Sequence, residues 1–262
     1  MTRKPLILVT NDDGIHAPGI VALVETAMSF GDVVVVAPDK PQSGMGHAIT
    51  INSTLRVERT NAHPGAESWS CSGTPVDCVK MAVNKLLPSK PALVLSGINH
   101  GANHSINIIY SGTMSAAMEG AIEGIPSAGF SLLDYSINAD FSASKVIAEK
   151  VIAFLLKKGL PGGVCLNVNI PKLHIDEIRG IRVCRQANGT WVEELDERTD
   201  PSGRKYYWLT GSFKNFEPEA TDTDVWALSN NYVSVVPAGT DLTAHSALEK
   251  IHPLNGAHPG KR

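Results

Sequence analysis

Two adjacent carboxylates are the first residues of this 262-residue chain whose types and spacing suggest chemistry. Asp12 and Asp13 follow the apolar run of residues 5–10 in the segment PLILVTNDDGIHAPGI. Apart from Arg3 and Lys4, no lysine or arginine lies near them in the sequence, so relief of their mutual repulsion must come from elsewhere. A turn followed by a helix start would also explain such residues. The segment by itself leaves two alternatives open, a cation site and an ordinary turn.

Two further loops carry side chains with oxygen atoms. They are residues 38–47, PDKPQSGMGH, and residues 96–104, SGINHGANH, and each follows an apolar, strand-like run. In an open parallel sheet, ligands bind beyond the carboxyl ends of the strands, where the strand order reverses. Carboxylates, hydroxyls and amides suit Mg²⁺, Mn²⁺ or Ca²⁺ better than zinc. The three loops together favour a divalent-cation site.

A second cluster, Ser111-Gly112-Thr113, opens a predicted helix. Backbone N–H groups at the start of a helix attract anions, and two hydroxyls beside a glycine would add donors around a phosphate-sized group. Ordinary capping of the helix by Ser111 or Thr113 is the alternative interpretation. Capping and anion binding are compatible, so the cluster is a candidate phosphate site.

An alternation of strand-like and helix-like segments must position these loops. Short apolar runs predict buried strands, and apolar residues at helical spacing predict the helices between them. The strand–helix–strand order at the N-terminus predicts a right-handed βαβ unit, and hence an α/β fold with a Rossmann-like, mostly parallel sheet flanked by helices. Predicted strands cover residues 5–10, 32–37, 92–96, 127–132 and 163–169, and predicted helices cover 18–30, 74–87 (with Thr74 as N-cap), 113–123 and 139–158.

The pattern changes after Gly180. Strand-like pieces at 181–185 and 205–209 flank the polar stretch VEELDERTDPSGR. We expect residues 1–180 to form the Rossmann-like core with the site, and residues 181–262 to form a C-terminal β-hairpin and helix extension that packs on the core and serves oligomerisation. The tail NGAHPGKR is predicted to be frayed.

Composition narrows the class of protein. The net charge of −3 argues against nucleic acid as a partner, because binding to phosphate backbones needs clustered lysine and arginine. No apolar stretch reaches 18 residues and the N-terminal apolar run is too short for a signal peptide, so we expect a cytoplasmic protein that does not span a membrane. The cysteines show no CxxC pair and are predicted to be free and buried: Cys71, Cys78, Cys165 and Cys184.

Taken together, the motifs resemble the SurE family of metal-dependent nucleotidases, and the resemblance covers most of the chain. The matching segments are TNDDGIHAPGI (10–20), VVAPDKPQSG (35–44), SGTPVDCV (72–79), VLSGINHGANHSINIIYSGTMSAAMEG (94–120) and YVSVVPAGTDLTAH (232–245). The combination of NDDG, SGIN and YSGT makes the resemblance specific, whereas none of the three would suffice alone.

The resemblance implies a set of site residues. It implies one Mg²⁺ or Mn²⁺ per subunit, held by Asp12, Asp13, Ser43 and Asn99. Phosphate-binding residues are expected at Asn103, Ser111, Gly112 and Thr113, and catalytic roles at Asp12, Asp13 and Asn103. Outside these motifs, Ser43 and Asn99 would be interpreted as an ordinary loop hydroxyl and a turn cap. The family commonly has a glycine where this chain has His104-Ser105, which affects the expected loop shape.

The activity implied is that of a 5′-nucleotidase, a phosphomonoesterase that releases phosphate from nucleoside monophosphates. Attack by a metal-activated water is the expected route, and an aspartyl-phosphate intermediate is the alternative. The resemblance also implies broad nucleotide use and a homodimer or homotetramer with exchanged C-terminal elements. The base preference, 5′ against 3′ specificity, polyphosphate activity and a general acid are not determined by the sequence.

Other classes of function remain for comparison. The chain lacks the G-x-G-x-x-G motif of dinucleotide-dependent oxidoreductases and the GxxxxGK[ST] motif of P-loop enzymes. A nucleotide-sensing module without catalysis stays open as an alternative. His16 is expected to orient its loop, and His100 and His104 are candidates for the mouth of the site. Asp241 and His245, four residues apart, are either a catalytic pair or, as we expect, a structural ion pair.

Overall fold

The computed structural model describes residues 4–255, so the predicted frayed tail lies almost wholly outside the described residues. The strands are β1 (Leu6–Thr10), β2 (Asp32–Pro38), β3 (Val57–Thr60), β4 (Glu67–Cys71), β5 (Leu93–His100), β6 (Ser127–Leu132), β7 (Val164–Ile170), β8 (Ile181–Val183), β9 (Gly189–Thr199), β10 (Lys205–Asn215) and β11 (Val233–Gly239). The α-helices are α1 (Pro18–Ala27), α2 (Pro75–Met81, continued by a π-helical turn over Ala82–Leu86), α3 (Asn107–Tyr110), α4 (Gly112–Ile122), α5 (Ser142–Lys158), α6 (Asp224–Ser229) and α7 (Leu248–Ile251).

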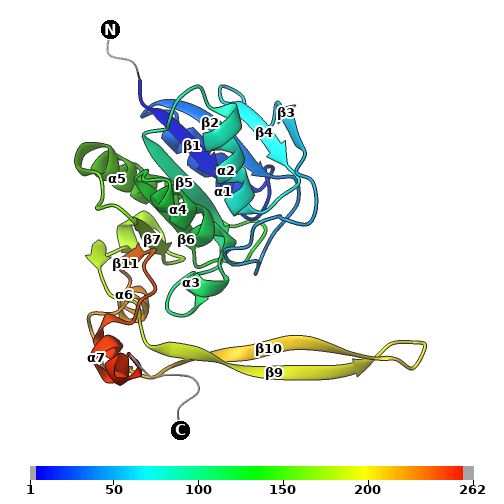
Figure 1. Ribbon diagram of the computed structural model, residues 1–262, viewed down its shortest axis with the longest axis vertical. Helices are drawn as coiled ribbons and strands as arrows, with labels where there is room; N and C mark the ends of the chain where they lie inside the picture. The colour runs from blue at the N-terminus through cyan, green and yellow to red at the C-terminus, as the bar shows by residue number, and fades with distance from the viewer. Residues whose placement is uncertain (1–3, 256–262) are drawn as a thin grey trace.

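One mixed sheet forms the centre of the molecule (Figure 1). Within residues 4–255 it has nine strands in the order β3-β4-β2-β1-β5-β6-β7-β11-β8, and the strands from β4 to β7 run parallel. From β1 the chain first moves by way of α1 to β2, and later by way of α2 to β5 on the other side of β1. The strand order therefore reverses between β1 and β5, which is where ligands bind in such sheets.

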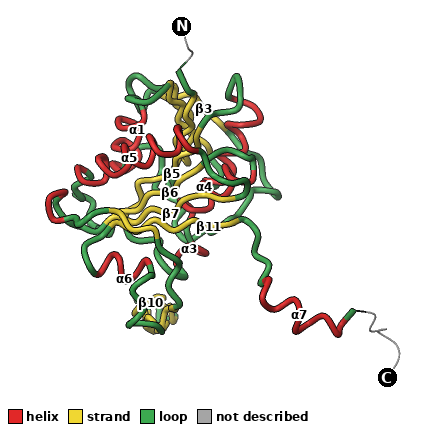
Figure 2. The backbone as a smooth tube through the Cα atoms, turned by 90° about the vertical axis from the view of Figure 1, so that its left-hand side faces the viewer, coloured by secondary structure: helices red, strands yellow, loops and turns green. Residues whose placement is uncertain are grey.

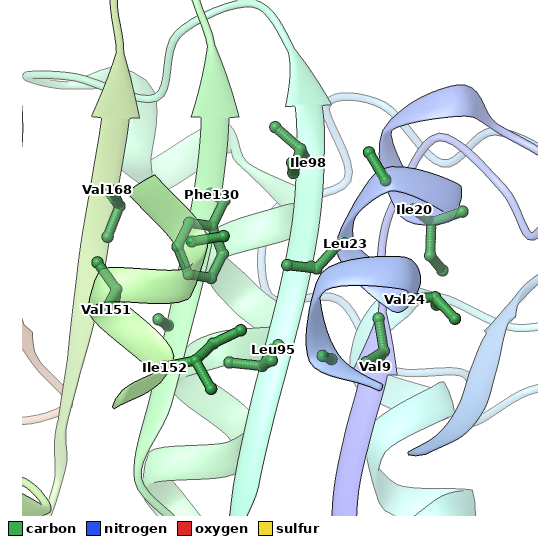
Figure 3. Packing of buried hydrophobic residues seen from close by; sticks show 14 of the residues in the cluster. Val9, Ile20, Leu23, Val24, Leu95, Ile98, Phe130, Val151, Ile152 and Val168 are labelled. Carbon is green, nitrogen blue, oxygen red and sulfur yellow. The ribbon is translucent and has the colours of Figure 1, made fainter. Parts of the chain in front are cut away.

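Helices cover both faces of the sheet. Successive residues of β1 point to opposite faces, and both sets are apolar, so each face packs against helices. Val9 packs with α1 and α5 in one apolar cluster, whereas Leu8 packs with α2 and α4 in a second. Figure 3 shows the first cluster, in which Leu23 of α1 and Phe130 of β6 fill the layer above the sheet. The predicted Rossmann-like, mostly parallel α/β fold is thereby confirmed.

The helix cap predicted at Thr74 is present. The Thr74 hydroxyl accepts a hydrogen bond from the Asp77 N–H at 3.1 Å, and the Asp77 carboxylate accepts one from the Thr74 N–H at 2.9 Å. This reciprocal capping box satisfies two N–H groups that the first turn of α2 leaves without helical partners. The four cysteines are free and buried, as predicted.

Strand β5 is longer than predicted and ends at His100 instead of Ser96. The register with β6 shifts between Ser96 and Asn99. Gly97 permits this because its φ of +123° suits glycine, and a Cβ there would lie 2.4 Å from the carbonyl oxygen of Phe130. The irregularity lets the strand continue to the edge of the sheet and carry Asn99 there.

Several other predicted boundaries differ from the structure. Helix α1 ends at Ala27 instead of residue 30, and α5 begins at Ser142 instead of residue 139. The polar stretch after Trp191 was expected to connect two short strands, but it forms most of β9 and the turn before β10. Both faces of this hairpin are exposed, so its sequence lacks the apolar alternation that reveals a half-buried strand.

The residues after Gly180 partly complete the sheet and partly project from it. Strand β11 pairs antiparallel with β7 and parallel with β8, whereas the β9–β10 hairpin extends away from the body in Figure 1. Helix α7 also stands clear of the body in Figure 2. Among the described residues, no helix is both long and apolar enough to cross a membrane.

Candidate active site

Asp12 joins the two clusters that the sequence singled out. It follows β1, is only 4% exposed, and accepts a hydrogen bond from the Thr113 hydroxyl in the first turn of α4. A Cβ at Gly112 would lie 2.7 Å from the Cβ of Asp12, so a larger residue could not occupy this position without displacement. The carboxylate therefore packs directly against the N-terminus of α4.

The charges of this pair have little compensation from the protein. Burial, followed by the repulsion of Asp13, raises the pKa of Asp12 to about 7. Burial also raises the pKa of Asp13, although the His100 backbone N–H donates to its Oδ2 atom at 3.3 Å. Neither aspartate forms an ion pair within the described part of the chain. A bound cation would stabilise both ionised carboxylates.

Asn99 reaches the same edge of the sheet from β5. Its Nδ2 atom donates to the Gly101 carbonyl at 2.8 Å, which fixes the orientation of the amide and leaves Oδ1 available as a ligand. Carboxylate, amide and hydroxyl oxygens, the donors of the four predicted ligands, are hard ligands of the type that suits Mg²⁺ or Mn²⁺. Within residues 4–255, no group of three or more His, Cys, Asp or Glu side chains is placed to hold a metal ion.

Ser43 lies in the loop after β2. The backbone of this loop contacts the backbone of Asp12. The Gln42 N–H donates to the Asp12 carbonyl at 2.8 Å, which brings the residue next to Ser43 against Asp12. The Ser43 side chain itself is exposed. Gly44 beside it has a φ of +74°, a conformation that glycine adopts without strain.

Sequence reasoning missed the side chains that hold this loop. The Asp77 carboxylate accepts hydrogen bonds from the N–H and the hydroxyl of Thr50, at 3.1 and 2.6 Å. Glu119, which is 2% exposed, pairs with His47 of the loop and with Lys80 of α2. The signal for Glu119 was its position as the only charged residue in the α4 segment GTMSAAMEGAI.

The predicted phosphate site lies at the first turn of α4. Ser111 is the N-cap, and its hydroxyl accepts from the Met114 N–H at 3.0 Å, so the capping alternative is realised. The first-turn N–H groups of Gly112 and Thr113 have no helical acceptor, because an α-helix leaves its first four N–H groups unpaired. The Thr113 N–H bonds to the Asp12 carboxylate and lowers its pKa, so the Gly112 N–H is the donor that this helix start leaves for an anion.

Asn103 is buried and bonded to β6 and β7. Its backbone N–H donates to the Asn169 side chain at 2.7 Å, and its own amide donates to the Ser131 hydroxyl at 2.8 Å. The next two residues, where this chain differs from the family pattern, turn toward the C-terminal region: Ser105 has a φ of +50°, and its N–H donates to Asp224 of α6 at 2.8 Å.

Comparison with known proteins identifies the family. The profile of the family described as Survival protein SurE matches residues 7–193, which is more than half of the chain. The chain belongs to the SurE family. It is 58% identical over 250 residues to the 5′-nucleotidase SurE of Flavobacterium psychrophilum, covering 95% of this chain and 97% of that protein. It is 61% identical over 251 residues to the 5′-nucleotidase SurE of Christiangramia forsetii, covering 95% and 96%.

A solved structure of a SurE protein has the same fold. The crystal structure of the SurE protein from Aquifex aeolicus superposes with a TM-score of 0.83 at 40% identity, covering 96% of this chain and 100% of that one. The SurE fold therefore extends beyond residue 193, where the family profile ends, to the C-terminal strands of this chain.

The histidines of this SurE chain take different places. His16 is exposed, whereas His100 packs edge-to-face on Phe141. The Nε2 atom of His245 lies 2.9 Å from the Asp241 carboxylate in an exposed pair, and the structural role of this pair remains a prediction.

A hollow of about 390 Å³ is lined in part by Tyr110, which directly precedes the N-cap of α4 and therefore the predicted phosphate site. The hairpin supplies its other wall, and the indole N–H of Trp191 is held by the Asn107 side chain at 2.6 Å. The lining residues are Tyr110, Trp191, Leu209, Thr210 and Gly211.

Proposed function

We propose that this SurE chain is a divalent-metal-dependent 5′-nucleotidase that hydrolyses nucleoside monophosphates to nucleoside and phosphate. One observation carries the proposal: at the reversal point of the sheet, Asp12 abuts the N-terminus of α4 with Asp13 beside it in the chain, and neither carboxylate has an ion-pair partner within residues 4–255. Such an arrangement offers a cation site and an anion site side by side. The name 5′-nucleotidase SurE, carried by relatives up to 61% identical, supports the same activity.

In this proposal, the cation is held by the side-chain oxygens of Asp12, Asp13, Ser43 and Asn99. When bound, it supplies Lewis-acid chemistry, lowering the pKa of a water molecule and reducing the charge of the phosphate. Asp12 is restrained from turning toward phosphorus, because its Oδ1 atom accepts a hydrogen bond from the Thr113 hydroxyl and its Cβ lies against Gly112. This restraint favours attack by water over an aspartyl-phosphate intermediate.

The chain's own donors would bind the transferred phosphoryl group. Asp12 accepts hydrogen bonds from both the hydroxyl and the backbone N–H of Thr113, so we assign phosphate binding to the backbone N–H of Gly112, the hydroxyl of Ser111 and the amide of Asn103. Fixed donors act most strongly on charge that redistributes during the reaction, and removing one such donor costs about 10²- to 10³-fold in rate.

The hollow beside Tyr110 is the proposed place of the nucleoside. Aromatic rings stack on any base because every base has a π-face, so stacking on Tyr110 and Trp191 would accept several bases. Broad use of nucleoside monophosphates agrees with this lining, which offers few polar groups for reading a particular base.

The test is phosphate release from AMP and GMP with Mn²⁺ or Mg²⁺, and again after chelation with EDTA. We expect release with metal, none with EDTA, and none from an Asp12→Asn variant that folds normally. Tight nucleotide binding without release under any metal condition would instead support the nucleotide-sensing alternative. Trapping of a phosphorylated aspartate would contradict attack by water.

We further propose that residues 181–262 serve assembly into a homodimer or homotetramer, on a core formed by residues 1–180. The hairpin supports this because it carries exposed large side chains, among them Tyr206 and Trp208, which are 41% and 59% exposed. A cytoplasmic location is supported by four buried cysteines that remain free thiols, as expected in a reducing compartment.

A further inference from the structure

A chain of buried polar side chains holds Asn103. We infer that Ser131, Asn167 and Asn169 form a positioning network that fixes Asn103 and lets its amide NH₂ group point at the transferred phosphoryl group. This inference rests on the proposed function and adds three residues that the family motifs of the sequence do not contain.

Both backbone polar groups of Asn103 are held by β7. Its N–H donates to the Asn169 Oδ1 atom at 2.7 Å, and its carbonyl accepts from the Asn167 Nδ2 atom at 2.8 Å. The two strand residues are also joined to each other, because the Asn169 Nδ2 atom donates to the Asn167 Oδ1 atom at 2.8 Å. The position of Asn103 is therefore determined by β7 and not by its own loop.

The network lies on the side of the sheet where α4 packs. Residues of a strand alternate between faces, and Val168 between the two asparagines belongs to the apolar cluster of α1 and α5. Cys165, two residues before Asn167, packs instead against Met114 of α4. The asparagines thus point to the face that carries the proposed phosphate site.

Burial of these four polar side chains carries a desolvation cost. Ser131 and Asn169 are 0% exposed, Asn167 is 1% and Asn103 is 6%. A buried amide must be hydrogen-bonded to offset its desolvation, and apolar residues would fill the same strand positions at lower cost. Three of the four bonds end on Asn103 and the fourth joins Asn167 to Asn169, which indicates that the placement of Asn103 is what the network provides.

Ser131 also orients the Asn103 amide. In the structure one N–H of the Nδ2 atom donates to the Ser131 hydroxyl, which leaves the second N–H and Oδ1 to face other groups. Oxygens of a phosphate dianion accept hydrogen bonds, so a useful Asn103 must present its NH₂ group to them. A hydroxyl can donate as well as accept. After a half-turn of the amide, Ser131 donates to Oδ1 and the NH₂ group is free for phosphate.

A double-mutant cycle tests whether Ser131 acts through Asn103. The variants are Ser131→Ala, Asn103→Ala and the double variant, measured by kcat and KM on AMP with Mn²⁺ and by the Kd of inorganic phosphate with Mn²⁺. We expect Ser131→Ala to lower kcat/KM by about 10- to 100-fold and to weaken phosphate binding, because the donor is misplaced. In the Asn103→Ala background, the same change should have less than about a twofold effect.

Ser127→Ala is the matched control. Ser127 lies on the same strand and is equally buried, and its hydroxyl donates to the Ile125 carbonyl at 2.6 Å. It stands at the opposite end of β6 from Ser131, so its loss should leave kcat/KM and phosphate affinity unchanged. If Ser131→Ala does not fold, Ser131→Cys keeps most of the side-chain volume and replaces it in the cycle.

Three results would overturn the inference. They are equal effects of Ser131→Ala and Ser127→Ala, independent effects of Ser131→Ala and Asn103→Ala that multiply in the double variant, and phosphate affinity unaffected by Asn103→Ala. Failure of the proposed function has a different signature, namely a wild-type chain that releases no phosphate from AMP with any metal. The phosphate-binding cycle remains readable in that case.

Discussion

The edge of the sheet that carries the candidate site (the site edge) and the β9–β10 hairpin differ in which side chains they bury. At the site edge, polar side chains such as Asn103 and Asn169 are buried and bonded to one another. On the hairpin, apolar side chains such as Trp208 are exposed, and the ion pairs around them lie at the surface. Many buried polar groups of this region bond within the chain, but Asp12 and Asp13 have no ion-pair partner among the described residues, and Asn11 and Ser96 keep buried oxygens without a hydrogen bond. The hairpin has apolar surface that another molecule would cover.

Asp12→Asn should have the largest effect, because it removes the charge that the site edge leaves without an ion-pair partner. We expect a loss of about 10³-fold or more in kcat/KM with an unchanged fold. Steady-state phosphate release and circular dichroism measure the two quantities. Asp32→Asn, an exposed change at the start of β2, is the control. Wild-type activity in the Asp12 variant would remove Asp12 from the catalytic machinery.

Gly112→Ala tests the close packing between Asp12 and α4. The added Cβ would lie 2.7 Å from the Asp12 Cβ, so one of the two elements must shift. We expect kcat/KM to fall by about 100-fold and Mn²⁺ affinity, measured by calorimetry, to fall with it. Gly162→Ala is the matched control, since a Cβ there meets nothing within 4 Å. Equal behaviour of the two variants would show that the packing is unimportant.

Tyr110→Ala tests the region where the two parts of the molecule meet. Loss of one stacking surface should raise KM for AMP about tenfold. KM for p-nitrophenyl phosphate is the comparison, and it should change far less if the ring contacts only the nucleoside. Equal increases for both substrates would indicate a disturbed helix start instead of a lost base contact.

The exposed apolar surface of the hairpin predicts an effect on assembly. The double change Tyr206→Ser and Trp208→Ser should lower the molar mass measured by light scattering at micromolar concentration. Hydrolysis per subunit should change less than about twofold, because neither side chain lines the hollow beside Tyr110. Arg198→Ser on the facing strand is the control. An unchanged mass would exclude this face from the interface.

The smallest expected effect concerns pH and stability without metal. Folding raises the pKa of Asp12 from its ordinary value of 3.8 to about 7, so the folded state keeps a proton that the unfolded state has lost. Stability of the metal-free protein should therefore fall as pH rises from about 4 to 7 and level off above that range. Melting temperatures in EDTA should show this fall in wild type and a smaller one in Asp12→Asn. Parallel curves would contradict the assignment.

The sequence predicted most of what is local. Asp12 and Asp13 were found because they directly follow an apolar strand, and the Thr74 cap was found because its partners lie within four residues. The sheet was predictable for the same reason, since each buried strand is a short continuous apolar run. The metal and phosphate roles of these residues remain predictions.

What the sequence did not predict depends on distant contacts or on exposure. Asn167 and Asn169 looked like ordinary strand residues, because their bonds to Asn103 span 64 and 66 positions. The hairpin was predicted too short, because a strand with two exposed faces has no buried side to produce alternation. Glu119 was missed because its partner His47 is 72 positions away.

The Asp224 carboxylate of α6 joins the loop after β5 to the segment that precedes the hairpin. One oxygen accepts the N–H of Ser105 at 2.8 Å, and the other accepts the N–H of Ala187, two residues before the hairpin, at 2.9 Å. A chain shortened after residue 193 would retain every predicted metal ligand but lose this clasp. Minimal versions of the enzyme designed from the ligand residues alone would therefore be incomplete.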